Sequence, residues 1–221
     1  MAHSVADTAI MPIKPPNTQA QLELLHRALD GCRACPQMIG PVVHGPPVVS
    51  QVILIGQAPG PREGTFGRPF AWTAGKTLFR WFASVLPASE EDFRTKVYIS
   101  AVARCFPGKA KGGGDRRPNP REIERCQTYL EQEVALLKPK LILPVGTLAI
   151  ERVLGRKQPL IEVIGNQQKV SYLGVETDVI CLPHPSGAST WHRMEPGKTL
   201  LAKALHLAAK HPEMKSLFQK Q

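Results

Sequence analysis

Four short apolar runs alternate with segments of helical periodicity along this chain. The runs are VILIG at 52–56, VYISAV at 97–102, LILPVG at 141–146 and VICLP at 179–183. Each has the length of a buried strand, and apolar residues recur at helical spacing in 77–86, 122–137 and 147–155. Strands that alternate with helices form a mainly parallel sheet with helices on both faces. The sequence therefore predicts an α/β fold.

The remaining segments indicate one domain with a loose N-terminal arm. Residues 1–17 are proline-rich and lack periodicity, so we expect a flexible arm followed by a single domain at 18–221. A first helix is expected from Asn17 and Thr18 to about Gly31, and a last helix over 197–210. The segment 160–174 suggests a hairpin or an irregular insertion, and the glycine-rich, basic stretch 108–117 suggests a mobile loop.

The charge balance favours an anionic partner. Lysine and arginine number 28 against 18 acidic residues, a net charge of +10 at pH 7, and clustered cations gain free energy by displacing counterions from a phosphate backbone. Many basic proteins bind no nucleic acid, so charge alone does not decide the partner. No apolar stretch has the roughly 20 residues of a membrane span, and the N-terminus lacks the pattern of an export signal. We expect a soluble, cytoplasmic monomer with no membrane partner.

Five cysteines in a chain without an export signal do not predict a disulfide framework, because the cytosol keeps thiols reduced. Cys32 and Cys35 form a CxxC pair, and the layout of strands and helices would allow Cys105 and Cys126 to join them. Four thiolates suit either zinc or an iron–sulfur cluster. The alternative is that some of them are simply buried thiols. Cys181 lies inside an apolar run and is expected in the core.

Ligands of open α/β sheets bind beyond the carboxyl ends of the strands, so the residues after each apolar run are candidates for a site. The loop from Gly56 to Gly60 lets backbone N–H groups approach a ligand closely, or it is only a tight turn. Phe70 is either a stacking platform for a flat ring or a core residue. His184, between two prolines, is either a donor aimed at developing negative charge or a structural histidine.

Taken in order, the motifs are GCRACP, GQAPGPREGTFGRPF, YISAVARCFPG, CQTYL and HPSGAST. This set, which spans about 31–210, resembles the iron–sulfur branch of the uracil-DNA glycosylase superfamily, its families 4 and 5. The resemblance implies a three-layer α/β/α fold with a central four-stranded, mainly parallel sheet. It also implies a structural 4Fe-4S cluster held by Cys32, Cys35, Cys105 and Cys126.

The resemblance also assigns a base pocket. The residues that match the motif lining the deoxyribose and uracil site are Gly56, Ala58, Pro59 and Gly60. Phe70 matches the ring that stacks on uracil, and His184 matches the histidine that stabilises the leaving base. Ser186 lies in the loop that follows His184 and is expected to contact the substrate.

Three positions depart from the family patterns. Gln57 stands where family 4 has a glutamate, and Ala101 stands where family 4 has the asparagine that reads the uracil edge. Thr73 falls where family 5 has an aspartate that helps to activate water. The AVARC segment and the HPSGAST loop are closer to family 5, whose pocket is less polar. We hypothesise that Gln57 orients the attacking water, and Glu63, the nearest acidic residue, is a further catalytic candidate.

The implied reaction is monofunctional base excision: the enzyme hydrolyses the N-glycosidic bond of a flipped-out uracil in double- or single-stranded DNA and leaves an abasic site. His184 is the expected electrostatic group. Candidates to contact DNA are Arg62, Trp191, His192 and Arg193, with Lys109, Lys111, Arg116 and Arg117 as further cations.

Three alternatives remain open at the level of sequence. The fold could be kept with its chemistry lost, leaving a protein that recognises damaged or single-stranded DNA, which the missing glutamate, asparagine and aspartate favour. The substrate could be another base, such as hypoxanthine or a deaminated or alkylated pyrimidine, because an apolar Ala101 makes no demand for uracil. The four cysteines could belong to a zinc-bound nucleic-acid module without a pocket.

Overall fold

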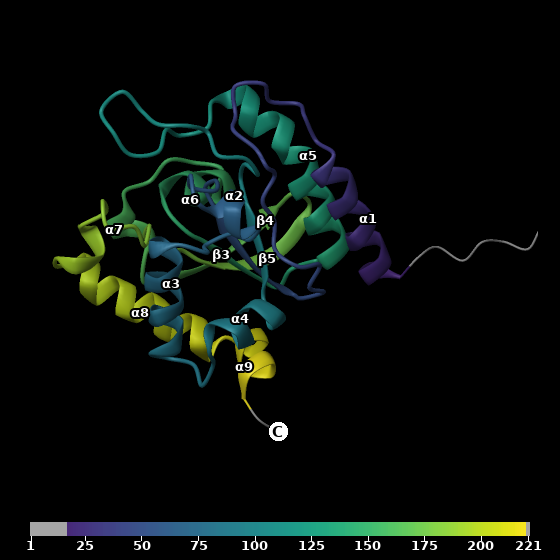
Figure 1. The fold of residues 1–221 in the computed structure, drawn as a ribbon. Coiled ribbons are helices and arrows are strands. Elements are labelled where there is room, and N and C mark those ends of the chain that lie inside the picture. The colour runs from purple at the N-terminus through teal and green to yellow at the C-terminus, as the bar shows by residue number, and fades with distance from the viewer. Residues whose placement is uncertain (1–16, 220–221) are drawn as a thin grey trace, which may run out of the picture.

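The computed structural model describes residues 17–219, so the arm expected at 1–17 lies outside the described residues apart from Asn17. Its centre is a five-stranded sheet with the strand order β2-β1-β3-β5-β4 (Figure 1). The strands are β1 (Val52–Gly56), β2 (Tyr98–Ala101), β3 (Leu141–Pro144), β4 (Gln167–Tyr172) and β5 (Val175–Ile180). β1 pairs in parallel with β2 and β3, and β3 pairs in parallel with β5. The α/β prediction with a mainly parallel sheet is confirmed.

Runs of mainly apolar sequence explain β1, β2 and β3. Every residue of β1, β2 and β3 is buried, as expected of parallel strands that have helices on both faces. Each of these strands falls inside the run that predicted it. In the register of β1 and β2, Gly56 lies opposite Ala101, so the segments that follow the two strands leave the same edge of the sheet.

The sheet has five strands, where four were expected. The segment 160–174 forms a short helix, α7 (Leu160–Val163), and then β4, which pairs antiparallel with β5. The turn between them uses Leu173 and Gly174, both with positive φ, as a tight hairpin requires. β5 begins at Val175, ahead of the expected run at 179–183. β4 is an edge strand with a solvated face, so its polar sequence lacked the apolar run that marks a buried strand.

Helices cover both faces of the sheet and complete three layers (Figure 1). On one side α1 (Thr18–Asp30) packs against α5 (Pro120–Leu137), and α6 (Thr147–Leu154) contacts α5. On the other side lie α3 (Thr73–Ala83), α4 (Glu90–Lys96), α8 (Gly197–Lys210) and α9 (Pro212–Phe218). Buried apolar side chains from the sheet and both helix layers form one continuous core.

The short helices were not expected from the sequence. They are α2 (Glu63–Phe66), α4, α7, α9 and the 3-10 turn η1 (Trp191–Arg193). One or two turns are too short for a periodic pattern, although α4 carries a local signal, a capping box between Ser89 and Asp92. The expected first and last helices are confirmed as α1 and α8. Within residues 17–219, no helix combines the length and the apolar character needed to cross a membrane.

Candidate functional site

The carboxyl ends of β1 and β2 form one corner of the candidate site. Beyond the Gly56–Ala101 pair, the N–H of Val102 donates to the Gly56 carbonyl over 2.9 Å. The N–H of Ala103 donates to the carbonyl of Gln57 over 3.0 Å. The loop from Gly56 to Gly60, called here the glycine-rich loop, and the AVARC segment therefore run side by side from the edge where ligands of α/β sheets bind.

A small cavity lies at this corner. It is lined by Gly56, Ala58, Pro59, Phe70 and Ala101, together with Val43, Glu63, Pro69, Ile99 and Ser100. Its volume is about 20 Å³, which is room for about one water molecule. A pyrimidine ring would fit only after the walls move apart. The predicted site residues that do not line this cavity are Gln57, Gly60, His184 and Ser186.

Phe70 is held in a conformation that few aromatic residues adopt. Its φ is 54°, in the left-handed region, and Arg94 fixes its carbonyl with a hydrogen bond of 2.9 Å. Its ring lies against Gly56, where a Cβ atom would be 2.9 Å from the ring Cζ. Its carbonyl lies against Gly75, where a Cβ atom would be only 1.6 Å from the oxygen. Two glycines therefore make room for this one aromatic residue.

Glu63 connects the two walls of the cavity. Its side chain is buried, and one carboxylate oxygen accepts from the N–H of Gly60 over 2.7 Å while the other accepts from the N–H of Ala71 over 3.1 Å. Burial raises the pKa of Glu63, and these backbone hydrogen bonds oppose the rise. Both carboxylate oxygens therefore accept hydrogen bonds from the protein itself. Glu63 holds the glycine-rich loop and the Phe70 segment together.

His184 is held in one tautomer. Its Nδ1 lies 3.2 Å from the backbone N of Ser186 and 2.9 Å from the Ser186 hydroxyl oxygen. A backbone N–H can only donate, so Nδ1 accepts and the ring proton of the neutral histidine resides on Nε2. Burial is the largest cause that lowers the pKa of His184. Gly146, after β3, allows the ring to lie close, since a Cβ atom there would be 3.0 Å from the ring Cδ2.

The predicted DNA-contacting loop at 191–193 turns partly inward. His192 is 8% exposed and its ring centroid lies 5.1 Å from that of Trp81. Burial lowers the pKa of His192, and a hydrogen bond with the backbone of His184 acts in the opposite direction. Trp191 packs on Gly197, where a Cβ atom would be 2.8 Å from the indole. A buried His192 cannot reach a phosphate in this conformation, whereas its neighbour Arg193 is exposed.

Asp115 is a carboxylate at the site that the sequence analysis missed. A Cβ atom at Gly60 would lie 3.6 Å from Asp115 Oδ2, and the charge of Asp115 acts to raise the pKa of His184. The residue thus lies between the glycine-rich loop and the histidine segment. The signal was present but weak: one acidic residue in the otherwise basic GGGDRR stretch.

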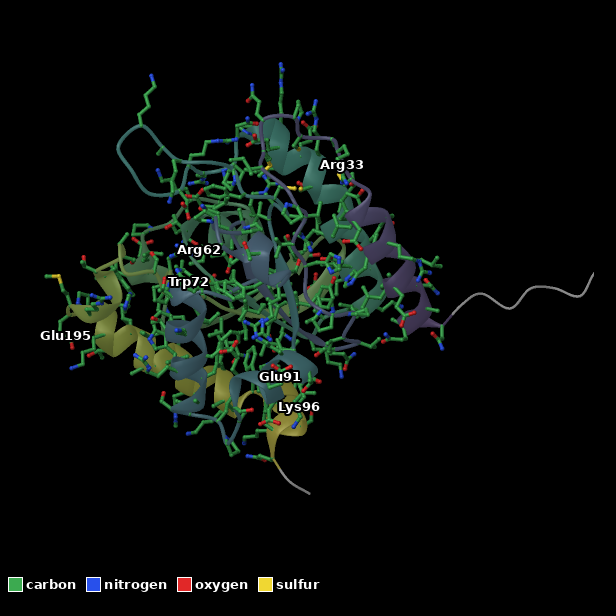
Figure 2. All side chains as sticks on the ribbon, viewed as in Figure 1. Arg33, Arg62, Trp72, Glu91, Lys96 and Glu195 are labelled. Carbon is green, nitrogen blue, oxygen red and sulfur yellow. The ribbon has the colours of Figure 1, made fainter. Side chains whose placement is uncertain are left out.

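The expected phosphate-binding cations fall into two groups. Those paired with carboxylates are Lys109 with Asp115, Arg116 with Glu122 and Arg117 with Glu151. Those that form no ion pair within residues 17–219 are Arg62, Lys111 and Arg193. Arg62 lies beside Trp72 on the surface of the molecule (Figure 2). The paired cations link the basic stretch 108–117 to itself, to α5 and to α6.

The cysteines predicted as ligands line a common cavity of about 450 Å³. These are Cys32, Cys35, Cys105 and Cys126. Burial and the three other thiols raise the pKa of Cys105 to about 11. Among residues 17–219, no group of three or more histidine, cysteine, aspartate or glutamate side chains is placed so that it could hold a metal ion. Cys181 is buried in the core, as expected.

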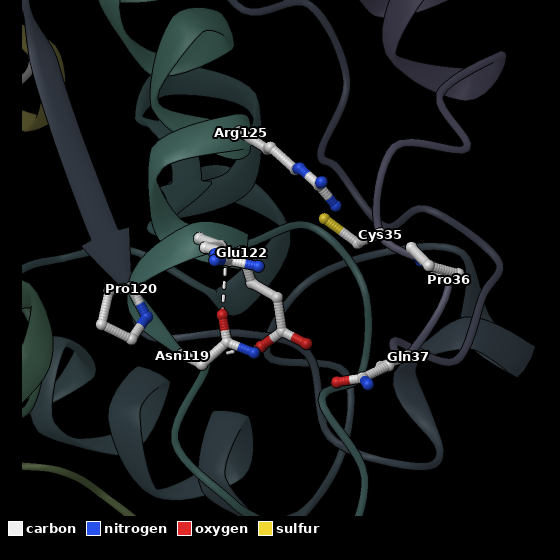
Figure 3. Close-up of a pocket in the computed structure, with 8 residues that line it drawn as sticks. Cys35, Pro36, Gln37, Asn119, Pro120, Glu122 and Arg125 are labelled. Atoms are coloured by element: carbon white, nitrogen blue, oxygen red, sulfur yellow. Dashed lines mark hydrogen bonds between the residues drawn. The ribbon is translucent and has the colours of Figure 1, made fainter.

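A further cavity, of about 520 Å³, lies between the Cys35 segment and the start of α5. Arg125 points toward Cys35 there and donates to the carbonyl of Ala34 over 2.6 Å (Figure 3). The first turn of α5 is fixed by a capping box between Asn119 and Glu122. The segment that carries the CxxC pair is therefore tied to α5, the helix that carries Cys126.

A buried ion pair lies behind the base pocket. Arg104 and Glu133 are 2.7 Å apart, with side chains 1% and 0% exposed. Arg104 also donates to the carbonyl of Ala101 over 2.9 Å, and the hydroxyl of Ser100 donates to Glu133 over 2.8 Å. Because Arg104 precedes Cys105, this pair holds the end of β2 and the approach to the thiol cavity together. Neither charge is marked by a pattern in the sequence.

This arrangement defines an α/β protein with a cavity at the carboxyl edge of its sheet, which is where proteins of this class bind their ligands. A family model described as the uracil DNA glycosylase superfamily matches residues 42–208. This chain belongs to that superfamily. The resemblance seen in its motifs is confirmed.

Several curated relatives are similar to the chain. A type-4 uracil-DNA glycosylase of Pyrobaculum aerophilum is 31% identical over 172 residues, covering 75% of this chain and 83% of the relative. A type-4 uracil-DNA glycosylase of Thermotoga maritima is 28% identical over 169 residues, covering 75% and 81%. A type-5 uracil-DNA glycosylase of Pyrobaculum aerophilum is 26% identical over 151 residues, covering 64% of each chain. Among these relatives, the two type-4 enzymes are more similar to the chain than the type-5 enzyme, and they cover more of it.

Proposed function

We propose that this protein removes uracil from DNA by hydrolysing the N-glycosidic bond and leaving an abasic site. The observation that carries the proposal is the apolar cavity at the ends of β1 and β2, where the Phe70 ring packs against Gly56. A flat base can stack on this ring once the walls move apart. The relatives named as uracil-DNA glycosylases support uracil as the base.

His184 supplies the hydrogen-bond donor for the leaving base. As the bond between C1′ and N1 breaks, negative charge develops on the base, and a donor aimed at that charge lowers the barrier. The Ser186 N–H occupies Nδ1, so the Nε2 proton is the one available to a ligand. The lowered pKa of His184 favours this neutral, donating form at physiological pH.

Asp115 supplies a carboxylate in place of the acidic residues that families 4 and 5 have at the positions of Gln57 and Thr73. Breaking the glycosidic bond leaves positive charge on the deoxyribose, and a nearby carboxylate stabilises that charge or orients the attacking water. Glu63 is less suited to this role, because both of its oxygens already accept backbone N–H groups. Gln57 follows Gly56 directly and retains the proposed role of orienting water by hydrogen bonding.

DNA is the macromolecular partner in this proposal. A base in a duplex is out of reach until it is flipped, which costs a few kcal/mol and least at unpaired sites. The unpaired cations Arg62, Lys111 and Arg193 are available to bind phosphates and offset that cost. The net charge of +10 favours the same partner.

The four thiols that line the thiol cavity suit a 4Fe-4S cluster, the group that the resemblance to families 4 and 5 implies. The residues that would hold the cluster are Cys32, Cys35, Cys105 and Cys126. When bound, the cluster would cross-link the CxxC loop, the end of β2 and α5, which is a structural role.

Ala101 favours a wider range of bases than uracil alone. Its methyl group lines the cavity where a polar side chain would demand a matching partner, and an apolar wall discriminates weakly between rings of similar shape. We therefore include hypoxanthine as a second, slower substrate.

The test is incubation of the purified protein with labelled oligonucleotides that carry uracil, hypoxanthine, ethenocytosine or cytosine, followed by alkali, which cleaves DNA at abasic sites. Cleavage at uracil, weaker cleavage at hypoxanthine and none at cytosine is the expected pattern. Binding without cleavage of any strand would instead support the reading in which the fold is kept and the chemistry lost.

A further inference from the structure

Two exposed aromatic rings lie together beside the base pocket. Phe66, at the end of α2, is 50% exposed, and Trp72, just before α3, is 41% exposed. Their ring centroids are 5.7 Å apart, and their planes lie within 23° of parallel. Neither ring belongs to the hydrophobic core. Neighbouring aromatic rings left in water indicate a binding surface rather than a packing role.

Two cations lie over the Trp72 ring. The guanidinium of Arg62 lies 5.0 Å from the centre of the Trp72 ring, and the ammonium of Lys76 lies 5.9 Å from it (Figure 2 for Arg62 and Trp72). In the part of the chain that the structure describes, neither cation forms an ion pair. Nearby Arg68, by contrast, lies 3.4 Å from a carboxylate oxygen of Glu91. The charges beside the rings therefore remain available to an anionic ligand.

Together these residues form what we call the aromatic platform, which consists of Arg62, Phe66, Trp72 and Lys76. Glu63 ties the platform to the base pocket on two sides. Arg62 precedes Glu63, and Trp72 follows Ala71, whose N–H donates to the Glu63 carboxylate over 3.1 Å. The other oxygen of the same carboxylate holds the glycine-rich loop at Gly60 over 2.7 Å. A ligand on the platform is thus one short chain segment away from the pocket walls.

We propose that the aromatic platform binds a nucleotide that neighbours the flipped one, stacking its base on the Phe66–Trp72 pair and holding its phosphate with Arg62 and Lys76. This inference rests on the proposed action on DNA. Exposed aromatic side chains combined with cations that track the backbone are the usual means of holding single-stranded nucleic acid without sequence preference.

The platform favours single strands over duplex. In a duplex each base face is covered by its neighbours, so only an unstacked base offers a face to Trp72. Flipping a base is cheapest where the strand is already unpaired. Capture of the neighbouring base on the platform would therefore direct the enzyme to unpaired or partly melted DNA.

The test measures binding rather than catalysis. The probe is a fluorescent, uracil-free single strand of about 15 nucleotides, a length in the range of single-strand binding sites, compared with the same strand in duplex. Trp72→Leu keeps an apolar side chain but removes the stacking face, and we expect it to weaken single-strand binding about 5- to 100-fold in fluorescence anisotropy. Trp72→Phe retains a ring and should stay within about 3-fold of the parent.

Cation variants and a control complete the experiment. The double variant Arg62→Gln, Lys76→Gln should weaken binding and reduce the slope of log K against log salt by about 1 to 2. Lys96→Gln is the matched control. Lys96, at the end of α4, also lies over an aromatic ring, with its ammonium 5.1 Å from the centre of the Phe218 ring, but it is far from the aromatic platform (Figure 2). It should bind DNA like the parent.

Unchanged single-strand affinity in folded Trp72→Leu overturns the proposal, as does an equal loss of duplex affinity. Tryptophan fluorescence gives a second readout if the leucine variant does not fold. The single strand should quench the parent, and Trp72→Phe should lose most of that quenching although Trp81 and Trp191 remain. The binding probe contains no uracil, so the platform and the activity are tested separately. Trp72-dependent binding of this probe, together with no release of uracil from the uracil-containing oligonucleotide, would refute the proposed activity and leave the platform standing.

Discussion

The backbone N–H of Ser186 donates to Nδ1 of His184 over 3.2 Å, and this contact fixes which ring nitrogen can act on a ligand. A ring nitrogen that accepts carries no proton in the neutral histidine, so Nε2 is the donor. Burial lowers the pKa of His184, and the nearby charge of Asp115 acts against this shift. The lowered pKa favours the neutral ring, whose Nε2 proton has a fixed direction, as the proposed role of His184 requires.

The pH dependence of the reaction follows from that contact. Because the pKa of His184 is lowered, its protonation requires a pH below the ordinary histidine value of about 6.5. The single-turnover rate should stay level as the pH falls through about 6.5 and decline only at lower pH. Asp115→Asn should move this decline further down, since it removes the charge that raises the His184 pKa. A rate that halves near the ordinary histidine value would contradict a neutral, buried donor.

Asp115 should affect chemistry more than binding. If its carboxylate stabilises the developing sugar cation, Asp115→Asn should slow uracil release about 10- to 1,000-fold. Affinity for an uncleavable DNA analogue should stay the same or increase slightly, because a negative charge is lost near phosphates. Rapid-quench kinetics and anisotropy measure the two effects. Asp92→Asn, an exposed aspartate in the cap of α4, is the control, and parent-like rates for Asp115→Asn would remove this residue from the mechanism.

Gly75 should tolerate no side chain. A Cβ atom there would lie 1.6 Å from the Phe70 carbonyl oxygen, so Gly75→Ala must displace the Phe70 segment. We expect a loss of about 1–3 kcal/mol or more in the free energy of unfolding, together with weakened uracil release. Gly112→Ala is a matched control, because no atom lies within 4 Å of a Cβ built there. Chemical denaturation measures the free energy of unfolding of both variants. A Gly75→Ala variant as stable as Gly112→Ala would contradict the close contact between Gly75 and Phe70.

The cluster assignment predicts a spectroscopic difference between cysteines. Purified protein should be brown, with iron and sulfide in equal amounts, and Cys105→Ser should lose visible absorbance along with thermal stability. Cys181→Ser provides the comparison, because Cys181 is buried in the core away from the thiol cavity. It should keep the colour. Zinc in place of iron in protein purified without oxygen would contradict the assignment.

The sequence could predict what depends on local patterns. β1 could be predicted because all five of its residues are apolar or glycine, and all are buried. α1 could be predicted because Asn17 is a capping residue: its side-chain oxygen accepts from the Ala20 N–H over 2.9 Å. The resemblance of motifs predicted the walls around Phe70. β4 was missed because an edge strand with a solvated face carries polar residues.

The rest depended on contacts between distant segments. Asp115 lies in the basic stretch 108–117, whose path is held by ion pairs such as Arg116 with Glu122 at 2.7 Å. No periodic pattern in the sequence marks such a path. His192 was expected on the surface beside Arg193, but the 3-10 turn η1 directs its ring toward Trp81. A turn of three residues has no sequence pattern that reveals which side chain points inward.

The central claim is that this pocket releases uracil with His184 as the donor. The most direct test is the single-turnover rate of uracil release from a defined single-stranded oligonucleotide, for the parent and for His184→Ala, with DNA affinity measured in parallel. We predict cleavage at uracil by the parent and a rate about 100- to 1,000-fold lower for His184→Ala, at nearly unchanged affinity. A parent that binds the strand without releasing uracil, or a folded His184→Ala variant as fast as the parent, would contradict the claim.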